Sequence, residues 1–337
     1  MFAYVIRRLF IGVILLIVMS LVTFILFFAS PVDPARYACG KNCTPALRAQ
    51  VNKALGYDKP TLQQWTDFMG GVVNGRQYPD DPSLRKSAPQ LVAECPAPCL
   101  GYSIVNSTTV NSEIKEAFPI SLSLALAAVI MWVVGGVAIG VLAAVRKGTI
   151  VDRGIVALAL VFYAFPSFFI GLFLLKFLAI KWQWVPIPTY TPITQDPGLW
   201  LQGLFLPALT LALLYMAGYV RMTRAFVLES MSEDYIRTAR SKGLKRGRVL
   251  FKHSMRAALT PLVTLIGLDF AGLMGGAIIT ESVFNYNGLG KLAVDANNTY
   301  DLPTIVGLVI LLGAFVIVAN IIVDLLYAVI DPRVRVG

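Results

Sequence analysis

Histidine is almost absent from this sequence, because His253 is the only one among 337 residues. A single imidazole cannot complete a metal cage or serve a Ser-His-Asp triad of ordinary spacing, and no H-E-x-x-H motif occurs. The phosphate-binding loop G-x-x-x-x-G-K-[ST] is also missing, so we do not expect this chain to hydrolyse ATP by itself. These absences argue against an enzyme and leave a transporter, a channel or a receptor.

Charged residues are scarce as well, at 14% of the chain against roughly 25% in soluble proteins, while 57% of the residues are hydrophobic. Several apolar runs approach or exceed about 20 residues, the length that a helix needs to span hydrocarbon. The first run is too long for a signal peptide and lacks a small-residue cleavage site, so we expect it to persist as a helix. The sequence predicts an all-α polytopic membrane protein with six transmembrane helices. We place them at Leu9–Ala29, Phe118–Val145, Gly154–Leu175, Phe205–Val220, Leu259–Thr280 and Ile305–Ile330.

The positive charges fall unevenly on the two sides of these spans. With the N-terminus inside, the inner segments hold 17 Lys and Arg residues against five acids, whereas the outer segments hold 12 against 11. Short loops rich in Lys and Arg stay in the cytoplasm. We therefore expect both termini to be cytoplasmic. The net charge of +10 is then a topology signal and gives no reason to invoke a nucleic-acid partner.

The segment 31–117 is polar and rich in Pro, Gly and Asp, unlike the rest of the chain. It contains all four cysteines: Cys39, Cys43, Cys95 and Cys99. Thiols on the outer side of a membrane are oxidised, so we expect two disulfides, and three connectivities are open. A zinc site is the alternative, but the C-x₃-C spacing and the lack of a histidine in the segment speak against it. A helical pattern at Leu62–Val73 indicates a small folded cap.

The largest inner loop, 221–258, contains ten Lys or Arg residues. Ser230 and Glu233 have the spacing of a capping box, which predicts a helix that starts near residue 231, and Gly243 suits the position after its last turn. A second helical stretch leads back to the membrane, and together they form a compact knob. The small residues Ala239 and Gly243 would let another surface approach its backbone. The alternative is that the charges only hold the loop inside and bind anionic lipid head groups.

Three carboxylates lie in or at the ends of spans: Asp269, Glu281 and Asp324. Ionisable groups are costly there and usually face a cavity or a partner. Asp269 lies in mid-span among glycines, where helices approach closely. It either lines a translocation path, where it could attract an amino group, or accepts a hydrogen bond from a neighbouring helix. For Glu281 and Asp324 we favour structural roles.

The stretch 234–243, Asp-Tyr-Ile-Arg-Thr-Ala-Arg-Ser-Lys-Gly, resembles the coupling loop (EAA loop) of bacterial ABC importer permeases. It is most similar to the permease subunits of dipeptide and oligopeptide importers. Its residues 237–239 depart from the E-A-A triplet, as is common in that subfamily, but the Ala and Gly spacing is kept. Similar motifs recur in order along nearly the whole chain outside about 35–110. They are Tyr4–Leu9, Pro31–Pro34, Pro119–Leu124, Gly140–Gly148, Phe165–Gly171, Glu281–Phe284, Gly288–Gly290 and Asp324–Arg333.

The resemblance implies a type I ABC importer permease fold. It carries over no counterpart of the cap between helices 1 and 2, which the cysteines themselves predict to be extracytoplasmic and disulfide-stapled. The parts of the chain are the first transmembrane helix (1–30), the cap (31–117), the permease core (118–331) with the coupling loop 221–258, and a cytoplasmic tail (332–337). The loop residues that the resemblance assigns to ATPase docking are Glu233, Asp234, Tyr235, Ala239, Arg240 and Gly243.

The resemblance also implies a function and partners. The chain would be a non-catalytic subunit in the bacterial cell membrane and would form half of a channel for dipeptides or oligopeptides. A homologous permease subunit, two ABC ATPase subunits and an extracytoplasmic binding protein would complete the importer, in contact with membrane lipid. ATP and Mg would bind to the ATPase subunits, and this chain would hold no cofactor or metal.

Three alternatives stay open at this point. The cargo of the same family could be a nickel chelate, glutathione or haem. An ion-driven secondary transporter would show internal repeats and paired intramembrane charges, and it would need no docking knob. A sensor with a ligand-binding cap would require a cytoplasmic signalling domain.

Overall fold

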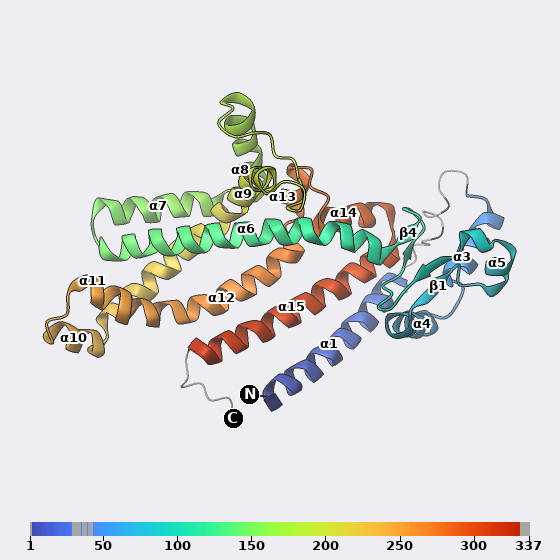
Figure 1. The fold of residues 1–337 in the computed structure, drawn as a ribbon, viewed down its shortest axis with the longest axis horizontal. Helices are drawn as coiled ribbons and strands as arrows, with labels where there is room; N and C mark the ends of the chain where they lie inside the picture. The colour runs from blue at the N-terminus through green and yellow to red at the C-terminus, as the bar shows by residue number, and fades with distance from the viewer. Residues whose placement is uncertain (1, 29–34, 36–38, 40–42, 331–337) are drawn as a thin grey trace. The chain divides into compact units, whose positions relative to one another are not determined.

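The computed structural model describes residues 2–28, 35, 39 and 43–330, and most of them are helical (Figure 1). Residues 31–34 of the expected cap and the expected tail 332–337 lie outside the described residues. The chain divides into two compact units, and each is described here by itself. The first comprises Met1–Pro119 and Asn287–Ile317, and the second comprises Ile120–Tyr286 and Val318–Gly337.

The predicted spans lie on helical segments, but Gly154–Leu175 covers two helices with a bend between them. Five helices of the described chain are long and apolar enough to cross a membrane, or six if one bent pair counts as a span. The five are α1 (Phe2–Phe28), α6 (Val110–Val145), α9 (Pro197–Ser232), α12 (Met255–Gly276) together with the segment before it, and α15 (Leu302–Ile330). The bent pair is α7 (Ile150–Ala164) with α8 (Ser167–Leu174) and the π-helical segment η2 (Leu175–Lys181).

The third predicted span, Gly154–Leu175, is wrong as a single straight helix. The chain turns by 102° between α7 and the helix that follows. Phe165 is extended, with φ −87° and ψ 138°, and Pro166 follows it. A proline disfavours helical geometry in the residue before it and has no N–H to donate, so the helix ends there.

The second unit is organised around α9, which packs against both α7 and α12. Close approach between helices depends on small residues. A Cβ on Gly140 of α6 would lie 2.6 Å from the side chain of Thr223 and 2.8 Å from the carbonyl oxygen of Val220, both on α9. A Cβ on Gly267 of α12 would collide with Val323 of α15. Glycines at such contacts let helix backbones meet in a membrane protein.

Short elements complete the second unit. After α9 come α10 (Asp234–Ser241), α11 (Arg246–Arg248) and the π-helical segment η3 (Val249–Ser254), and α13 (Ile278–Val283) follows α12. The end of α6 packs beside α9 and η3, because Ala144, Val227 and Leu250 share one buried cluster.

The described residues of the cap, in the first unit, form a small folded domain with helices and two short antiparallel sheets. Its helices are α3 (Pro45–Leu55), α4 (Thr61–Asn74), α5 (Pro82–Ser87) and the short η1 (Pro89–Leu91). Its strands are β1 (Arg76–Tyr78), β2 (Ala93–Cys95), β3 (Tyr102–Ser103) and β4 (Thr108–Thr109). Strand β1 pairs with β2, and β3 pairs with β4. Helix α14 (Leu289–Thr299) also belongs to the first unit.

Helix α4 covers the predicted helical pattern and fixes the cap to α1. Phe68 of α4 packs against Phe24 of α1 with ring centroids 5.1 Å apart. The indole nitrogen of Trp65 donates a hydrogen bond to the Ser20 hydroxyl at 3.0 Å. The hydrophobic face of α4 is therefore buried on the first helix of the same unit.

The structure pairs the cysteines locally, Cys39 with Cys43 and Cys95 with Cys99. This is the connectivity in which each bond closes one C-x₃-C loop. Cys95 and Cys99 are buried beside Tyr78, so this disulfide forms part of a small core under strand β1.

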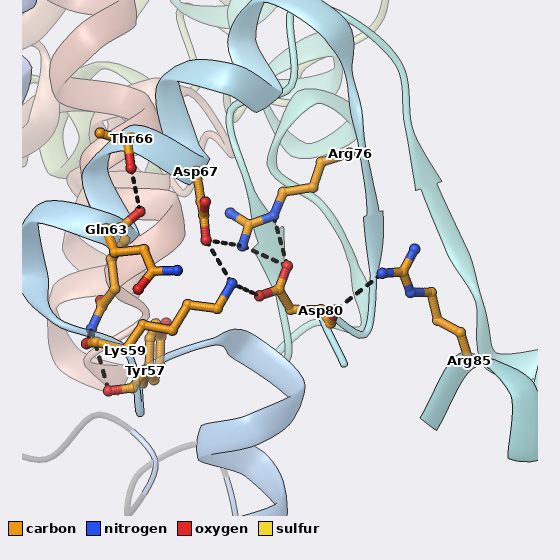
Figure 2. A network of polar contacts seen from close by, with 9 residues as sticks. Tyr57, Lys59, Gln63, Thr66, Asp67, Arg76, Asp80 and Arg85 are labelled. Carbon is orange, nitrogen blue, oxygen red and sulfur yellow. Dashed lines mark hydrogen bonds and ion pairs between the residues drawn. The ribbon is translucent and has the colours of Figure 1, made fainter. Parts of the chain in front are cut away.

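A polar network ties the turn after α3 to strand β1. Figure 2 shows Lys59 and Arg76 converging on Asp80, with Asp67 beside them. The Lys59 amine donates to Asp80 at 2.6 Å, and the Arg76 guanidinium donates to it at 2.7 Å. Burial alone would raise the pKa of Asp80, but the hydrogen bonds from Lys59 and Arg76 outweigh it and hold the pKa below its usual value.

We predict that Asp80→Asn loosens this part of the cap. A hydrogen bond to a charged group contributes about 1.5–3 kcal/mol, so amide exchange in residues 56–80 should speed up by about tenfold or more. Because the pKa of Asp80 is lowered in the folded state, its contribution is present at neutral pH. It is lost as the pH falls from the unfolded value of about 3.9 through the folded one. Hydrogen–deuterium exchange of the whole chain in nanodiscs measures this, and the exposed Asp58→Asn is the control. Equal protection in both variants would contradict the role of the network.

Candidate functional site

The knob (residues 233–254) has a hydrophobic interior of its own. Ile236 and Ala239 on α10 pack against Val249 of η3, and all three side chains are buried. Leu244, in the turn between the two segments, packs against the same cluster. The knob is therefore a compact element in which α10 is held against the chain that leads into α12.

The predicted start of the knob helix is wrong. Helix α9 continues through Ser232, the chain is extended at Glu233, and α10 begins at Asp234 without a side-chain cap. Ser230 is a buried residue of α9. Its hydroxyl lies 2.9 Å from the Tyr235 hydroxyl and donates to the Ser254 carbonyl oxygen at 3.2 Å. A serine whose hydroxyl binds an η3 carbonyl does not cap a helix, and this one links α9 to both sides of the knob.

The predicted docking residues divide into exposed and buried positions. Ala239 is 7% exposed, and its close contact is with this chain's own Val249, so it is not part of an outer surface of the knob. The other predicted docking residues are exposed: Glu233, Asp234, Tyr235, Arg240 and Gly243.

Gly243 occupies the position after the last turn of α10, as the sequence predicts. Its φ is +76°, and its N–H donates to the Arg240 carbonyl oxygen at 2.9 Å. A Cβ at this position would meet no other atom within 4 Å. A side chain here would strain the backbone and project into open space.

The exposed surface of the knob is strongly basic. Asp234 and Arg237 form an ion pair at 3.4 Å, and both side chains are largely exposed. Such a pair contributes little stability. The exposed cationic residues are Arg237, Arg240, Lys242, Lys245, Arg246, Arg248 and Lys252, against the acids Glu233 and Asp234.

The intramembrane carboxylates have different surroundings. Asp269 is half-buried, and Tyr219 of α9 donates its hydroxyl hydrogen to it at 2.7 Å. Glu281 on α13 is fully buried and accepts a hydrogen bond from Ser121 of α6 at 2.6 Å. The side chain of Asp324 lies outside the described residues. Asp269 therefore makes the hydrogen bond to a neighbouring helix that was one of its two expected roles. The hydrogen bond of Glu281 to α6 suits a structural role.

A further charged pair was not singled out in the sequence. Arg224 of α9 donates to both carboxylate oxygens of Asp152, at 2.6 and 2.8 Å. Asp152 also accepts the N–H of Gly148, so it orders the turn between α6 and α7. Asp152 and Arg224 are 72 positions apart, so no local pattern pairs them. The local sequence indicates only that Thr149 and Asp152 lie in the first turn of α7, which Thr149 caps.

The family follows from two sequence comparisons. The family model described as "binding-protein-dependent transport system inner membrane component" matches residues 136–336. The model of the corresponding N-terminal membrane component matches residues 1–125. The chain belongs to the binding-protein-dependent transport permease family. It is thus a permease of the ABC importer class, a multi-pass protein of the bacterial inner membrane. Permeases of this class are non-catalytic and work with ATPase and substrate-binding protein partners.

Curated relatives align along almost the whole length. The chain is 34% identical to a probable peptide ABC transporter permease, y4tP, of Sinorhizobium fredii, over 98% of this chain and 99% of the relative. It is 34% identical to the dipeptide transport system permease DppB of Escherichia coli K12, over 99% of both chains. It is 32% identical to a di/tripeptide permease, DppB, of Pseudomonas aeruginosa, also over 99% of both.

A solved structure shares the fold. The inward-facing methionine ABC transporter MetNI matches with a TM-score of 0.53 at 17% identity, over 66% of this chain and 97% of that chain. The expected type I importer permease fold is confirmed over the 66% of this chain that the match covers.

We predict that Ile236→Ala loosens the knob, because it leaves a cavity between α10 and η3. Truncation of a buried Ile costs about 2–5 kcal/mol, so amide exchange in residues 234–249 should rise at least about tenfold. The matched control is Arg237→Ala on the same helix, whose exposed side chain makes one surface ion pair. Unchanged exchange in Ile236→Ala would show that this packing does not hold the knob.

Proposed function

We propose that this chain is the transmembrane subunit of an ATP-driven importer of dipeptides or oligopeptides, in which it forms half of the translocation channel. One observation carries the peptide assignment. Relatives at 32–34% identity that match 98–99% of this chain are named as peptide, dipeptide or di/tripeptide permeases. Agreement over both the cap and the core favours a shared cargo class over a shared membrane scaffold alone.

The proposed topology has six spans, with α7 and α8–η2 counted as one, and both termini in the cytoplasm. The distribution of Lys and Arg supports it, since the inner segments hold 17 cations against five acids. The basic knob is then cytoplasmic, and the cap with its two disulfides is extracytoplasmic, where thiols are oxidised.

The proposed assembly contains a homologous second permease subunit, two ABC ATPase subunits and one binding protein that delivers cargo. ATP and Mg bind to the ATPase subunits, and this chain holds no cofactor. It lacks the phosphate-binding loop that ATP hydrolysis requires.

The knob suits the role of the ATPase docking element for two reasons. Its packed interior lets it transmit force without deforming, since Ile236 and Val249 are almost fully buried. Its outer surface presents Tyr235 and several cations around Gly243. Ser230 bonds the knob to the end of α9, so a displacement of the knob is passed to a membrane helix.

We predict that Gly243→Val leaves the chain inserted and correctly oriented but weakens ATPase binding or abolishes cargo-stimulated ATP hydrolysis. A valine at φ +76° strains the backbone by about 1–2 kcal/mol, and its side chain would hold a partner surface away. The measurement is ATP-dependent uptake of a radiolabelled dipeptide, and subunit assembly, in proteoliposomes with all partners.

Two controls accompany this variant. Gly247→Val adds the same side chain in the same loop, again with no atom within 4 Å, but at a residue without positive φ. Lys245→Gln with Arg246→Gln removes two charges and keeps the backbone. Both should impair coupling less. Wild-type uptake by Gly243→Val together with failure of the charge variant would contradict the docking role.

The same assay decides between cargo classes. Uptake of a nickel chelate, glutathione or haem in place of peptides would replace the peptide assignment within the family.

A further inference from the structure

Three helices of the second unit contribute three aromatic rings and Asp269 to one connected set of contacts. Trp132 of α6 stacks on Tyr215 of α9 with ring centroids 4.5 Å apart, and its ring lies 6.2 Å from that of Tyr219. Tyr219 in turn donates its hydroxyl hydrogen to Asp269 of α12 at 2.7 Å. A carboxylate and three aromatic rings thus share one region inside the helical core.

Asp269 lacks a cationic partner within the described part of the chain, where its only ion-pair or hydrogen-bond contact is with Tyr219. A carboxylate has about four acceptor sites, and the tyrosine occupies one. A charge inside a membrane span is costly unless it is paired or faces an aqueous cavity. Asp269 is half-buried, so part of its surface is open outside this helix contact.

The surrounding groups select the class of ligand. Aromatic faces attract organic cations, and a carboxylate pairs with an ammonium that carries N–H donors. A hard metal ion needs several oxygen ligands, and the described residues contain no group of three His, Cys, Asp or Glu side chains placed to hold one. The site therefore fits a primary ammonium with an adjoining neutral body better than it fits a metal.

We propose that Asp269, with Tyr219, Tyr215 and Trp132, forms a subsite for the ammonium group of the cargo as it passes this half of the channel. The inference rests on the proposed function, because a peptide carries a primary ammonium at its amino end. Asp269 supplies the charge, and Tyr219 orients the carboxylate. Trp132 is fully buried and holds the ring of Tyr215 by stacking on it, so Tyr215 is the partly exposed aromatic ring of the subsite.

The test is direct binding to the assembled transporter without its binding protein, which would otherwise impose its own selectivity. The probes are alanyl-alanine amide, which carries an ammonium and no carboxylate, and its N-acetylated form, which is neutral. Calorimetric titration of the wild-type complex should show the free-amine probe binding at least about tenfold more tightly than the acetylated one. Equal affinity of the wild-type complex for the two probes would overturn the inference.

Asp269→Asn should remove this preference. The amide oxygen of the asparagine still accepts the Tyr219 hydrogen bond, so the helix contact is kept while the charge is lost. The matched control is Asp295→Asn, which removes a charge from an exposed residue of α14 and should keep the preference. Tyr219→Phe keeps the charge and removes its orienting hydrogen bond, so it should give an intermediate preference.

Peptide uptake measured in parallel distinguishes failure of the ammonium subsite from failure of the proposed peptide-import function. If the wild-type transporter imports peptides but Asp269→Asn still prefers the free amine, the subsite is wrong and the proposed function stands. If the transporter imports only cargo without an ammonium, the peptide function is wrong and the subsite falls with it. Assembly and basal ATP hydrolysis of each variant show that it is folded.

Discussion

The interior of a bilayer offers no hydrogen-bonding partner to a peptide backbone, and this constraint shapes most of the chain. It requires each crossing segment to satisfy its own N–H and C=O groups, so the apolar runs form long helices. It also favours a hydrogen-bond partner for an ionisable side chain within a span. Asp269 accepts from Tyr219 and Glu281 from Ser121, and each contact joins two helices. The helical core is thus specified by its few polar contacts as well as by its apolar surface.

Helix α9 connects the features that matter for transport. Tyr219, Arg224 and Ser230 lie along it in this order, and they contact Asp269, Asp152 and Ser254 respectively. At 1.5 Å per residue, the 11 positions from Tyr219 to Ser230 span about 16 Å. One continuous helix therefore joins the proposed ammonium subsite to the knob. A movement of the knob would reach Asp269 without passing through a flexible loop.

Local patterns were enough to predict the helices but not their contacts. Hydropathy located the five long apolar helices and the bent pair, and Gly243 was recognisable because a left-handed turn favours glycine. The bend at Pro166 was missed because the apolar run continues through it. The Ser230–Glu233 spacing imitates a capping box, although the serine bonds across to η3. Ala239 fits an outer contact and an inner one equally well by size. Asp152–Arg224 and Tyr219–Asp269 are 72 and 50 positions apart, and no local pattern relates such residues.

In the proposed topology the cap and the knob of the same chain lie on opposite sides of the membrane, and sided labelling tests this most directly. Single cysteines are introduced at exposed residues, Asp58→Cys in the cap and Thr238→Cys in the knob, and the unmodified chain with its cysteines paired serves as the blank. A membrane-impermeant maleimide applied to intact spheroplasts should label Asp58→Cys alone, and inside-out vesicles should show the reverse. Labelling of both cysteines from the same side, or in the opposite order, would contradict the account.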